Sequence, residues 1–405
     1  MRVLMVCDQY PPFVGGIERH VQVLARGLTE RGHDVAVATM AAADLPAEAD
    51  EDGVRVYRLP ATTHRAGRAA TPSGRPYAPP FPDPEATHAL RRVLVRERPD
   101  VVHGHNWLAR SFLPLKEWSG AALVETLHDY GVVCAKLSLW WRGAPCSGPA
   151  FEKCLRCAAR NYGTARGMAV TLGNWAAAPL ERALVDVYLP VSQAVAEGNR
   201  LAAVGATYEI VPNFVPDAVA DEADPDHPAL AGLPAEAFWL YVGTLSRHKG
   251  VHVLLDAYRQ LVEPPPLVLI GSRRPDSPTE FPRGTIILGD LPHDAVMAAW
   301  KRAALAIVPS VFPDPCPTVA IEAMAAGVPV VGSRLGGLSD IVAEGETGRL
   351  VPGGDAAALS VALAELHAQP LVRQRMARAA LERVHAFTAS AVLQRLEGIY
   401  GRVAA

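Results

Sequence analysis

Short apolar runs alternate with segments of helical periodicity along most of the chain, and this alternation limits the fold more than any other feature. The run Val3–Cys7 has the length and composition of a buried strand. After a Pro- and Gly-rich turn, apolar residues recur at the spacing of one helix face, at Ile17, Val21, Leu24 and Leu28. The apolar run Val35–Thr39 follows. A strand, a helix and a strand in this order predict a parallel βαβ unit with a right-handed crossover.

The same alternation continues in two series. In the first series we expect further strands at Arg55–Leu59, Asp100–His103, Leu123–Leu127, Asp186–Val191 and Glu209–Val211. In the second we expect strands at Phe238–Val242, Leu267–Ile270, Thr285–Leu288, Leu305–Val308 and Pro329–Gly332. The fold class is therefore α/β, with two doubly wound, Rossmann-like domains facing a cleft. Ligands of such sheets bind outside the carboxyl ends of the strands, which makes the cleft the expected site.

Composition marks the border between the two series. Residues 215–236 are rich in Pro, Ala and acidic side chains and lack a hydrophobic pattern, which is typical of a linker. We therefore predict an N-terminal domain at 1–214, with a Cys-rich insertion at about 131–160, and a C-terminal domain at 237–386. Helical patterns are expected at Val251–Val262, Asp355–Gln369, Leu371–Ala386 and Ala389–Val403. The last segment, 387–405, is expected to form a separate terminal helix.

Composition and charge exclude several classes of protein. Half of the 405 residues are hydrophobic and a fifth are charged, so each domain can bury a core. The net charge of −3 does not provide the basic surface of a nucleic-acid-binding protein. The apolar run at the N-terminus is too short for a secretory signal, and no apolar stretch is long enough to span a bilayer. We expect a cytoplasmic protein whose six cysteines are reduced.

Two carboxylates lie near a predicted helix start after the strand Leu305–Val308. Asp314 precedes this helix, whose borders are indicated by Pro317 in its first turn and Gly327 beyond its end. The N–H groups of a helix N-terminus favour an anion. Glu322 lies inside the helix among small and apolar residues, where a carboxylate needs a partner. A ribose diol is one such partner; an Arg or Lys side chain for Glu322, with Asp314 as a turn residue, is the alternative.

Two cations and two glycines occupy further loops at strand ends. Arg247 and Lys249 lie between the strand that ends at Val242 and the next helix, where basic side chains can neutralise a diphosphate. A solvated helix start is the alternative. Gly15 and Gly16 follow the first strand and permit close approach of backbone to a ligand, although a tight turn explains them equally well.

Histidines end two of the predicted strands of the first series. His103 and His105 belong to one of them, and His128 follows Leu127 in the other. A structural role in the core is the alternative for each histidine.

The chain resembles, over its whole length and most specifically between Leu305 and Pro352, the retaining GT-B glycosyltransferases of family 4, also called glycosyl transferases group 1. The resemblance lies in the acidic pair Asp314 and Glu322, eight residues apart, and in the segments Val328–Ser333, Gly336–Val342 and Gly345–Val351. In this family the first acid contacts the transferred sugar and the second contacts the nucleotide ribose. The resemblance implies that the domain at 1–214 binds the acceptor, that the domain at 237–386 binds a nucleotide sugar, and that the helix at 387–405 crosses back to the N-terminal domain.

The resemblance also assigns roles to residues outside the acidic pair. It implies catalytic roles for His128 at the donor sugar and for Lys249 and Arg247 at the diphosphate. It further implies a set of donor-binding residues, namely Gly15, Gly16, Gly243, Thr244, Cys316, Thr318 and Glu322. The chain departs from the family at Asp314, which is usually Glu, at Cys316-Pro317, which is often Phe-Gly, and at Thr244, which stands at the position of an arginine.

The implied reaction is transfer of a hexose-type sugar from a UDP-, GDP- or ADP-sugar to a hydroxyl of a glycan, glycolipid or small molecule. The family mechanism retains the anomeric configuration, uses the leaving phosphate as the acceptor of the hydroxyl proton, and needs no catalytic metal. Two other interpretations stay open: a nucleotide-sugar epimerase of the same architecture, and an inactive nucleotide-binding scaffold. The departures at Thr244 and Asp314 are what favour the scaffold.

The Cys-rich insertion gives a separate prediction. Its thiols Cys134, Cys146, Cys154 and Cys157 suit a tetrahedral structural zinc, with buried thiols or a Cys154–Cys157 redox pair as alternatives. Basic and aromatic residues of the first domain also suggest a peripheral contact with the inner face of a membrane, against the alternative of scattered solvated charge. They are Arg65, Arg68, Arg75, the stretch Leu139-Trp140-Trp141-Arg142, Lys153, Arg156, Arg160 and Arg166. The sequence indicates no oligomeric state.

Overall fold

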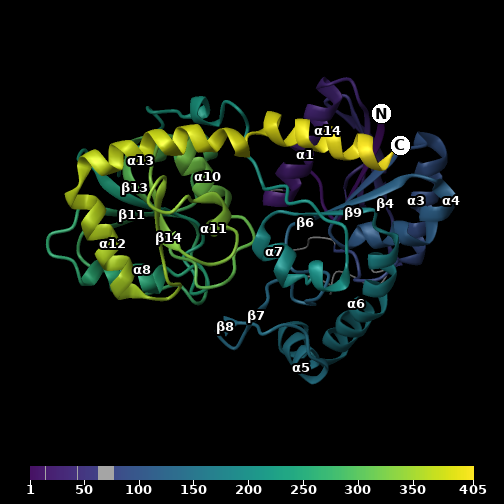
Figure 1. Cartoon of the computed structure of the whole chain (residues 1–405), viewed down its shortest axis with the longest axis horizontal. Coiled ribbons are helices and arrows are strands. Elements are labelled where there is room, and N and C mark those ends of the chain that lie inside the picture. Colours follow the sequence, from purple (N-terminus) through teal and green to yellow (C-terminus); the bar gives the residue numbers. More distant parts are fainter. Residues whose placement is uncertain (14, 43, 63–76) are drawn as a thin grey trace. The chain divides into compact units, whose positions relative to one another are not determined.

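The computed structural model describes residues 1–13, 15–42, 44–62 and 77–405. These residues divide into two compact units. Unit 1 comprises Met1–Trp141, Cys146–Pro212 and Val392–Ala405, and unit 2 comprises Arg142–Pro145 and Asn213–Ala391. Arg65, Arg68 and Arg75 of the suggested membrane surface lie outside the described residues. Figure 1 shows the helices and strands of both units.

Unit 1 contains a sheet in the order β3-β4-β2-β1-β5-β6-β9. Its strands are β1 (Arg2–Cys7), β2 (Asp34–Met40), β3 (Glu48–Glu51), β4 (Val54–Leu59), β5 (Val101–His105), β6 (Ala122–Leu127) and β9 (Val187–Pro190). All neighbours pair in parallel except β3, which runs antiparallel to β4. The strand order reverses between β1 and β5, so their carboxyl ends form a switch point where ligands bind in such sheets.

Helices connect the parallel strands of unit 1. They are α1 (Gly16–Glu30), α3 (Pro84–Glu97), α4 (Lys116–Ser119), α5 (Phe151–Tyr162), α6 (Thr164–Leu184) and α7 (Gln193–Gly198), together with the 3-10 helix η2 (Trp107–Leu115). Helix α3 begins as its sequence predicts, because the Asp83 side chain accepts from the N–H groups of Glu85 and Ala86 and Pro84 is the first helical residue.

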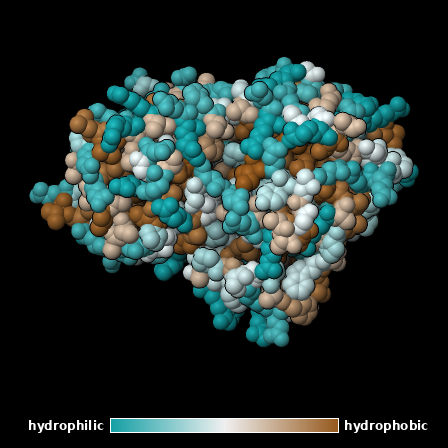
Figure 2. All heavy atoms as spheres, viewed as in Figure 1, coloured by the Kyte–Doolittle hydropathy of each residue, from teal (hydrophilic) through white to brown (hydrophobic). Residues whose placement is uncertain are grey.

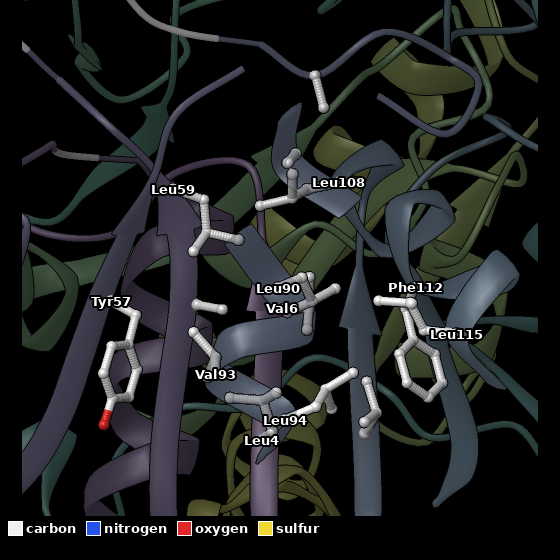
Figure 3. Close-up of a cluster of buried hydrophobic side chains, with 14 of the residues drawn as sticks. Leu4, Val6, Tyr57, Leu59, Leu90, Val93, Leu94, Leu108, Phe112 and Leu115 are labelled. Atoms are coloured by element: carbon white, nitrogen blue, oxygen red, sulfur yellow. The ribbon is translucent and has the colours of Figure 1, made fainter. Parts of the chain in front are cut away.

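The core of unit 1 lies where helices pack on the sheet. Figure 3 shows Leu4 and Val6 of β1 among side chains of α3 and η2, including Leu90, Val93 and Phe112. Leu4, Val6, Leu90 and Phe112 are fully buried, and Val93 is 6% exposed. Burial of such apolar side chains stabilises the fold by about 1.5–3 kcal/mol each.

The C-terminal helix α14 (Ala389–Val403) reaches unit 1, as the family resemblance implies. Within that unit, Glu397 accepts from Arg31 at 3.0 Å, and Glu209 accepts from Arg395 at 2.8 Å. Tyr400 of the same helix is fully buried. The end of the chain is therefore part of the first domain's core.

Unit 2 contains a second parallel sheet in the order β12-β11-β10-β13-β14-β15. Its strands are β10 (Phe238–Val242), β11 (Leu267–Ile270), β12 (Thr285–Leu288), β13 (Ala303–Val308), β14 (Val330–Ser333) and β15 (Gly348–Val351). Its helices are α8 (Val251–Arg259), α9 (His293–Arg302), α10 (Thr318–Ala325), α11 (Leu338–Ile341), α12 (Ala356–Ala368) and α13 (Pro370–Arg383). The order reverses between β10 and β13, which places a second switch point there.

The fold confirms the predicted α/β class and corrects some elements. Residues 209–211 form no strand: the N–H groups of Glu209 and Val211 donate to carbonyls of β9, and the neighbouring Tyr208 makes only an isolated bridge. Strands β3 and β15 were not expected. The polar sequence of β3, Glu-Ala-Asp-Glu, suits an edge strand and has no buried-strand pattern.

Hydrophilic and hydrophobic residues are interspersed over the face of the molecule in Figure 2. Within the described ranges, no helix combines the length and apolar character needed to cross a bilayer.

Candidate active site

The clearest candidate site lies at the switch point of unit 2. Lys249 is in the loop after β10, and Asp314 is in the loop after the neighbouring strand β13. Lys249 Nζ donates to Asp314 Oδ2 at 2.6 Å. The Lys249 side chain is 31% exposed and that of Asp314 is 11% exposed, so the pair lies at the protein surface with its cation accessible. The predicted cation and the first predicted acid are therefore together.

Two glycines allow the loops around this pair to approach closely. Gly250 has φ +75° and Gly336 has φ +63°, a region that disfavours other residues. A Cβ on Gly250 would collide with the Pro309 carbonyl, and one on Gly336 would collide with the backbone of Asp314. The next N–H, of Gly337, donates to the Asp314 carbonyl at 2.8 Å. The glycine-rich segment after β14 thus fixes the position of the acid.

An aromatic ring forms one side of the cation's environment. Lys249 Nζ lies 5.3 Å from the centroid of the Phe312 ring, within the range of a cation–π contact. His248 packs on the same ring edge to face at 5.2 Å. Burial, and then the charge of Lys249, lower the pKa of His248, so this imidazole is neutral near pH 7.

Glu322 is on α10, and its partner was not anticipated. Its Oε1 lies 3.2 Å from Nε2 of His293, the first residue of α9. The other ring nitrogen of His293 lies 3.1 Å from Glu222 Oε2. One imidazole therefore bridges two carboxylates, in place of the Arg or Lys that the alternative interpretation named. The Glu322 side chain is 13% exposed, so a ligand can reach it.

The other predicted donor-binding residues of unit 2 occupy the same loops. Thr318 is the first residue of α10, so Pro317 precedes the helix and does not belong to its first turn. The Cys316 carbonyl accepts from Asn213 at 3.1 Å, and burial raises the pKa of its thiol to about 12. Cys316 is therefore a protonated, packed thiol.

The loop after β10 holds the remaining predicted residues. Gly243 has φ +146°. The Thr244 carbonyl accepts from the Tyr241 hydroxyl at 2.7 Å. The Arg247 side chain is exposed, and its backbone N–H donates to Asp276 at 2.9 Å. These contacts orient the loop that presents Lys249.

Unit 1 has a histidine cluster at its own switch point. His105 ends β5, His128 follows β6, and His20 comes from α1, which begins just after Gly15. His105 Nδ1 lies 3.0 Å from His128 Nε2, and the His20 and His128 rings are 4.7 Å apart. One ring nitrogen from each of the three histidines lies within 4.8 Å of the others. Imidazoles in this arrangement suit a transition metal or a polar ligand.

Burial keeps the imidazoles of His20, His103 and His105 uncharged. Desolvation lowers the pKa of His20 and His105 well below the usual range and that of His103 to about 3. Both ring nitrogens of His103 are hydrogen-bonded, Nδ1 to the Tyr400 hydroxyl at 2.6 Å and Nε2 to the Thr126 hydroxyl at 2.7 Å, so the role of His103 is structural. His105 Nε2, by contrast, is buried and lacks a hydrogen-bond partner among the residues described.

Two buried carboxyls support the same edge of the sheet. Asp8, directly after β1, accepts from the N–H of Leu108 at 2.8 Å, and Asp129, directly after His128, accepts from the N–H of Gly131 at 2.7 Å. Burial raises the pKa of Asp8 to about 7 and that of Asp129 to about 6. Both carboxyls therefore titrate near neutral pH.

Sequence reasoning missed His20 and His293. His20 is three residues after Ile17 and four before Leu24, so it lies on the face of α1 that the apolar spacing buries. That spacing was available as a signal. His293 had none, because its role depends on how α9 packs beside α10.

The four cysteines of the insertion line one cavity in unit 1. Cys154 and Cys157 are on α5, and all four are free thiols. Among the described residues, the group that brings three possible metal-ligand atoms together is the histidine cluster and does not include these cysteines.

Comparison with known proteins identifies the chain. Residues 15–186 match the glycosyl transferase 4-like domain and residues 233–383 match glycosyl transferases group 1. A glycogen synthase of Mycobacterium tuberculosis is 30% identical, with 95% of this chain and 90% of that protein covered. Among solved structures, the sucrose-phosphate synthase of Thermosynechococcus elongatus has a TM-score of 0.72 at 22% identity, covering 99% of both chains. Anabaena HepE in complex with UDP has a TM-score of 0.69 at 15% identity, covering 99% of this chain and 100% of that one.

The strand orders of the two sheets and the likeness to these solved structures show the GT-B fold. The chain belongs to the family glycosyl transferases group 1, which confirms the resemblance found in the sequence. It is a glycosyltransferase, and the epimerase and scaffold interpretations are not favoured.

Proposed function

We propose that this glycosyltransferase moves a hexose-type sugar from a nucleoside-diphosphate sugar to an acceptor hydroxyl, with retention of the anomeric configuration and without a catalytic metal. The observation that carries the proposal is the Lys249–Asp314 pair at the β10/β13 switch point. A cation and an acid at this edge meet the two needs of the reaction, a charge for the leaving diphosphate and an acceptor for sugar hydroxyls.

The donor is held by charge and by backbone N–H groups. Lys249 exchanges its contact with Asp314 for the diphosphate, and the N–H of Thr318 at the start of α10 adds a donor for an anion. Exposed Arg247 supplies a second cation from the same loop. Cys316 contributes its backbone N–H, which Pro317 cannot, and the loop around Gly243 and Thr244 completes the donor site.

Glu322 binds the nucleotide ribose. Its carboxylate accepts from the two ribose hydroxyls in place of His293, and His293 keeps its contact with Glu222. UDP is the first nucleotide to test, since HepE was solved with UDP. GDP and ADP are the other members of the expected set.

Unit 1 contributes His128 and the Gly15–Gly16 turn at the donor sugar, as the family resemblance implies, and binds the acceptor. The acceptor is a glycan, a glycolipid or a small molecule. In the transfer step, the bond from the anomeric carbon to the leaving phosphate oxygen breaks.

The acceptor oxygen forms its bond to the anomeric carbon on the same face, and the acceptor hydroxyl gives its proton to the leaving phosphate. The protein orients the reactants and stabilises the developing charge. We assign the reaction to the cytoplasm, with lipid-linked acceptors reached at the inner face of a membrane.

The test is a donor and acceptor screen followed by determination of the product's anomeric configuration. Protein assayed in buffer without added divalent cations should release a nucleoside diphosphate and form a glycoside with the donor's configuration. The Asp314→Asn variant should lose this turnover. An inverted product, or turnover that requires added Mg²⁺ or Mn²⁺, would contradict the proposal. Epimerised donor in the absence of any acceptor would favour the epimerase.

A further inference from the structure

We propose that Cys134, Cys146, Cys154 and Cys157 bind one structural zinc ion that holds together the insertion after β6. All four thiols line a single cavity. They come from three separate pieces of chain: the turn that carries Cys134, the loop that carries Cys146, and helix α5. Four cysteine thiolates are a common ligand set of closed, structural zinc sites.

The insertion needs such a link because it has little core of its own. Of the residues in α5, all of which are described, Ala158 alone is buried, and Phe151 at its start is 54% exposed. Hydrogen bonds tie the insertion together. Examples are Tyr162 Oη to the Ala135 carbonyl at 2.9 Å and the Cys146 N–H to the Leu139 carbonyl at 2.7 Å. A small module of this kind depends on disulfides or a metal for stability.

Backbone N–H groups face two of the sulfurs. Those of Leu139, Lys136 and Ser138 face the Cys134 sulfur and partly offset the effect of burial, which raises the pKa of this thiol. The N–H of Ala150 donates to the Cys154 sulfur at 3.4 Å. Such N–H to sulfur bonds stabilise the negative charge of metal-bound thiolates and orient the ligands.

Two cations lie beside the cavity and balance the charge of a zinc tetrathiolate. Lys136 and Lys153 are among its lining residues. Lys136 Nζ donates to the Trp140 carbonyl at 3.3 Å, and Lys153 Nζ donates to the Ser147 hydroxyl at 2.9 Å. Zinc with four thiolates carries a net charge of about −2, which two lysines offset.

Metal binding has a structural and a protonic consequence. Zinc–sulfur bonds of about 2.3 Å require sulfurs roughly 3.8 Å apart, so zinc draws the thiols inward across the cavity. Zinc binds cysteines as thiolates, so its binding displaces the thiol protons and its affinity rises with pH.

The first experiment measures zinc in the whole protein, purified under reducing conditions without chelator. Elemental analysis should find about one zinc per chain in the wild type. The Cys154→Ser/Cys157→Ser variant should lose it, and Cys7→Ala, a buried thiol of β1, should keep it. Zinc-free wild type, or a zinc content that survives in the double variant, would overturn the proposal.

A second measurement does not depend on the folding of a variant. Zinc in the wild type is exchanged for Co²⁺, and the absorption spectrum is recorded. Tetrahedral thiolate ligation should give a sulfur-to-cobalt charge-transfer band and intense d–d bands. A spectrum with nitrogen ligands only would place the metal at the histidine cluster of His20, His105 and His128 and would refute the cysteine site. A disulfide between Cys154 and Cys157 that persists in protein purified under reducing conditions would refute the cysteine site as well.

Discussion

Replacing Lys249 by Ala tests whether its charge serves the diphosphate of the donor. The variant loses a charge-assisted hydrogen bond, worth about 1.5–3 kcal/mol. Because the Lys249 side chain is 31% exposed, the lower end of that range applies, roughly a tenfold loss of affinity. The change also leaves Asp314, whose side chain is 11% exposed, without the partner that neutralises it.

The unpaired carboxylate adds a second penalty. If the Asp314 carboxylate and a diphosphate charge are roughly 10 Å apart in a medium of effective dielectric constant about 20, their repulsion costs about 1.7 kcal/mol. The Lys249→Ala variant should therefore bind a nucleoside diphosphate roughly 100-fold more weakly. The double variant Lys249→Ala/Asp314→Asn should recover about tenfold of that loss, since it lacks the free carboxylate.

Isothermal titration calorimetry with the nucleoside diphosphate alone measures both effects, because a ligand without sugar does not require Asp314 for hydroxyl contacts. Lys249→Arg is the matched control that keeps a positive charge. Unchanged affinity in Lys249→Ala would refute the role of the cation. A double variant as weak as the single one would refute the electrostatic reasoning about Asp314.

Three further predictions concern stability and geometry. Arg110→Met should destabilise unit 1 by about 3–5 kcal/mol in denaturant unfolding, because Glu181, its ion-pair partner at 2.6 Å and 1% exposed, becomes an unpaired buried charge. The double variant Arg110→Met/Glu181→Leu should regain most of this stability, and equal stabilities of the single and double variants would contradict the prediction. The pKa of Asp8 is about 7 in the folded state against 3.8 in the unfolded chain, so the folded state binds the proton more tightly and the free energy of unfolding should fall by about 4 kcal/mol between pH 4 and 7. Asp8→Asn should flatten this dependence in melting curves recorded across that pH range, and an unchanged dependence would refute the role of the Asp8 carboxyl. Gly336→Ala should reduce turnover more than nucleotide binding, because its Cβ displaces the backbone of Asp314, and wild-type kinetics would show that this loop does not set the position of the acid.

Much of the site at the β10/β13 edge could be predicted from the sequence. Apolar runs locate the strands, and alternation with helices implies parallel pairing, so residues just past neighbouring strand ends meet at one edge. Lys249 and Asp314 are 65 positions apart in the chain and bond directly for this reason. The glycines that position them could be read as loop signals, but which carbonyl each one accommodates depends on the folded loops.

Contacts that depend on helix packing could not be predicted. His103 bonds Tyr400 across 297 positions, and only the docking of α14 on unit 1 brings them together. The pairing of His293 with Glu322 likewise follows from α9 packing beside α10, for which no local pattern exists. Residues 209–211 were wrongly expected to be a strand, because a short apolar run beside β9 gains two hydrogen bonds without a full ladder.

The central claim is that the carboxyl edge of the unit 2 sheet binds a nucleoside diphosphate through Lys249 and Glu322. The most direct test titrates the purified protein with UDP, GDP, ADP and TDP and repeats the titration with Glu322→Ala. The proposed site predicts one clear binder, with affinity reduced roughly 10-fold in the variant by loss of the ribose contact. A folded protein that binds none of the four, or an affinity untouched by Glu322→Ala, would contradict it.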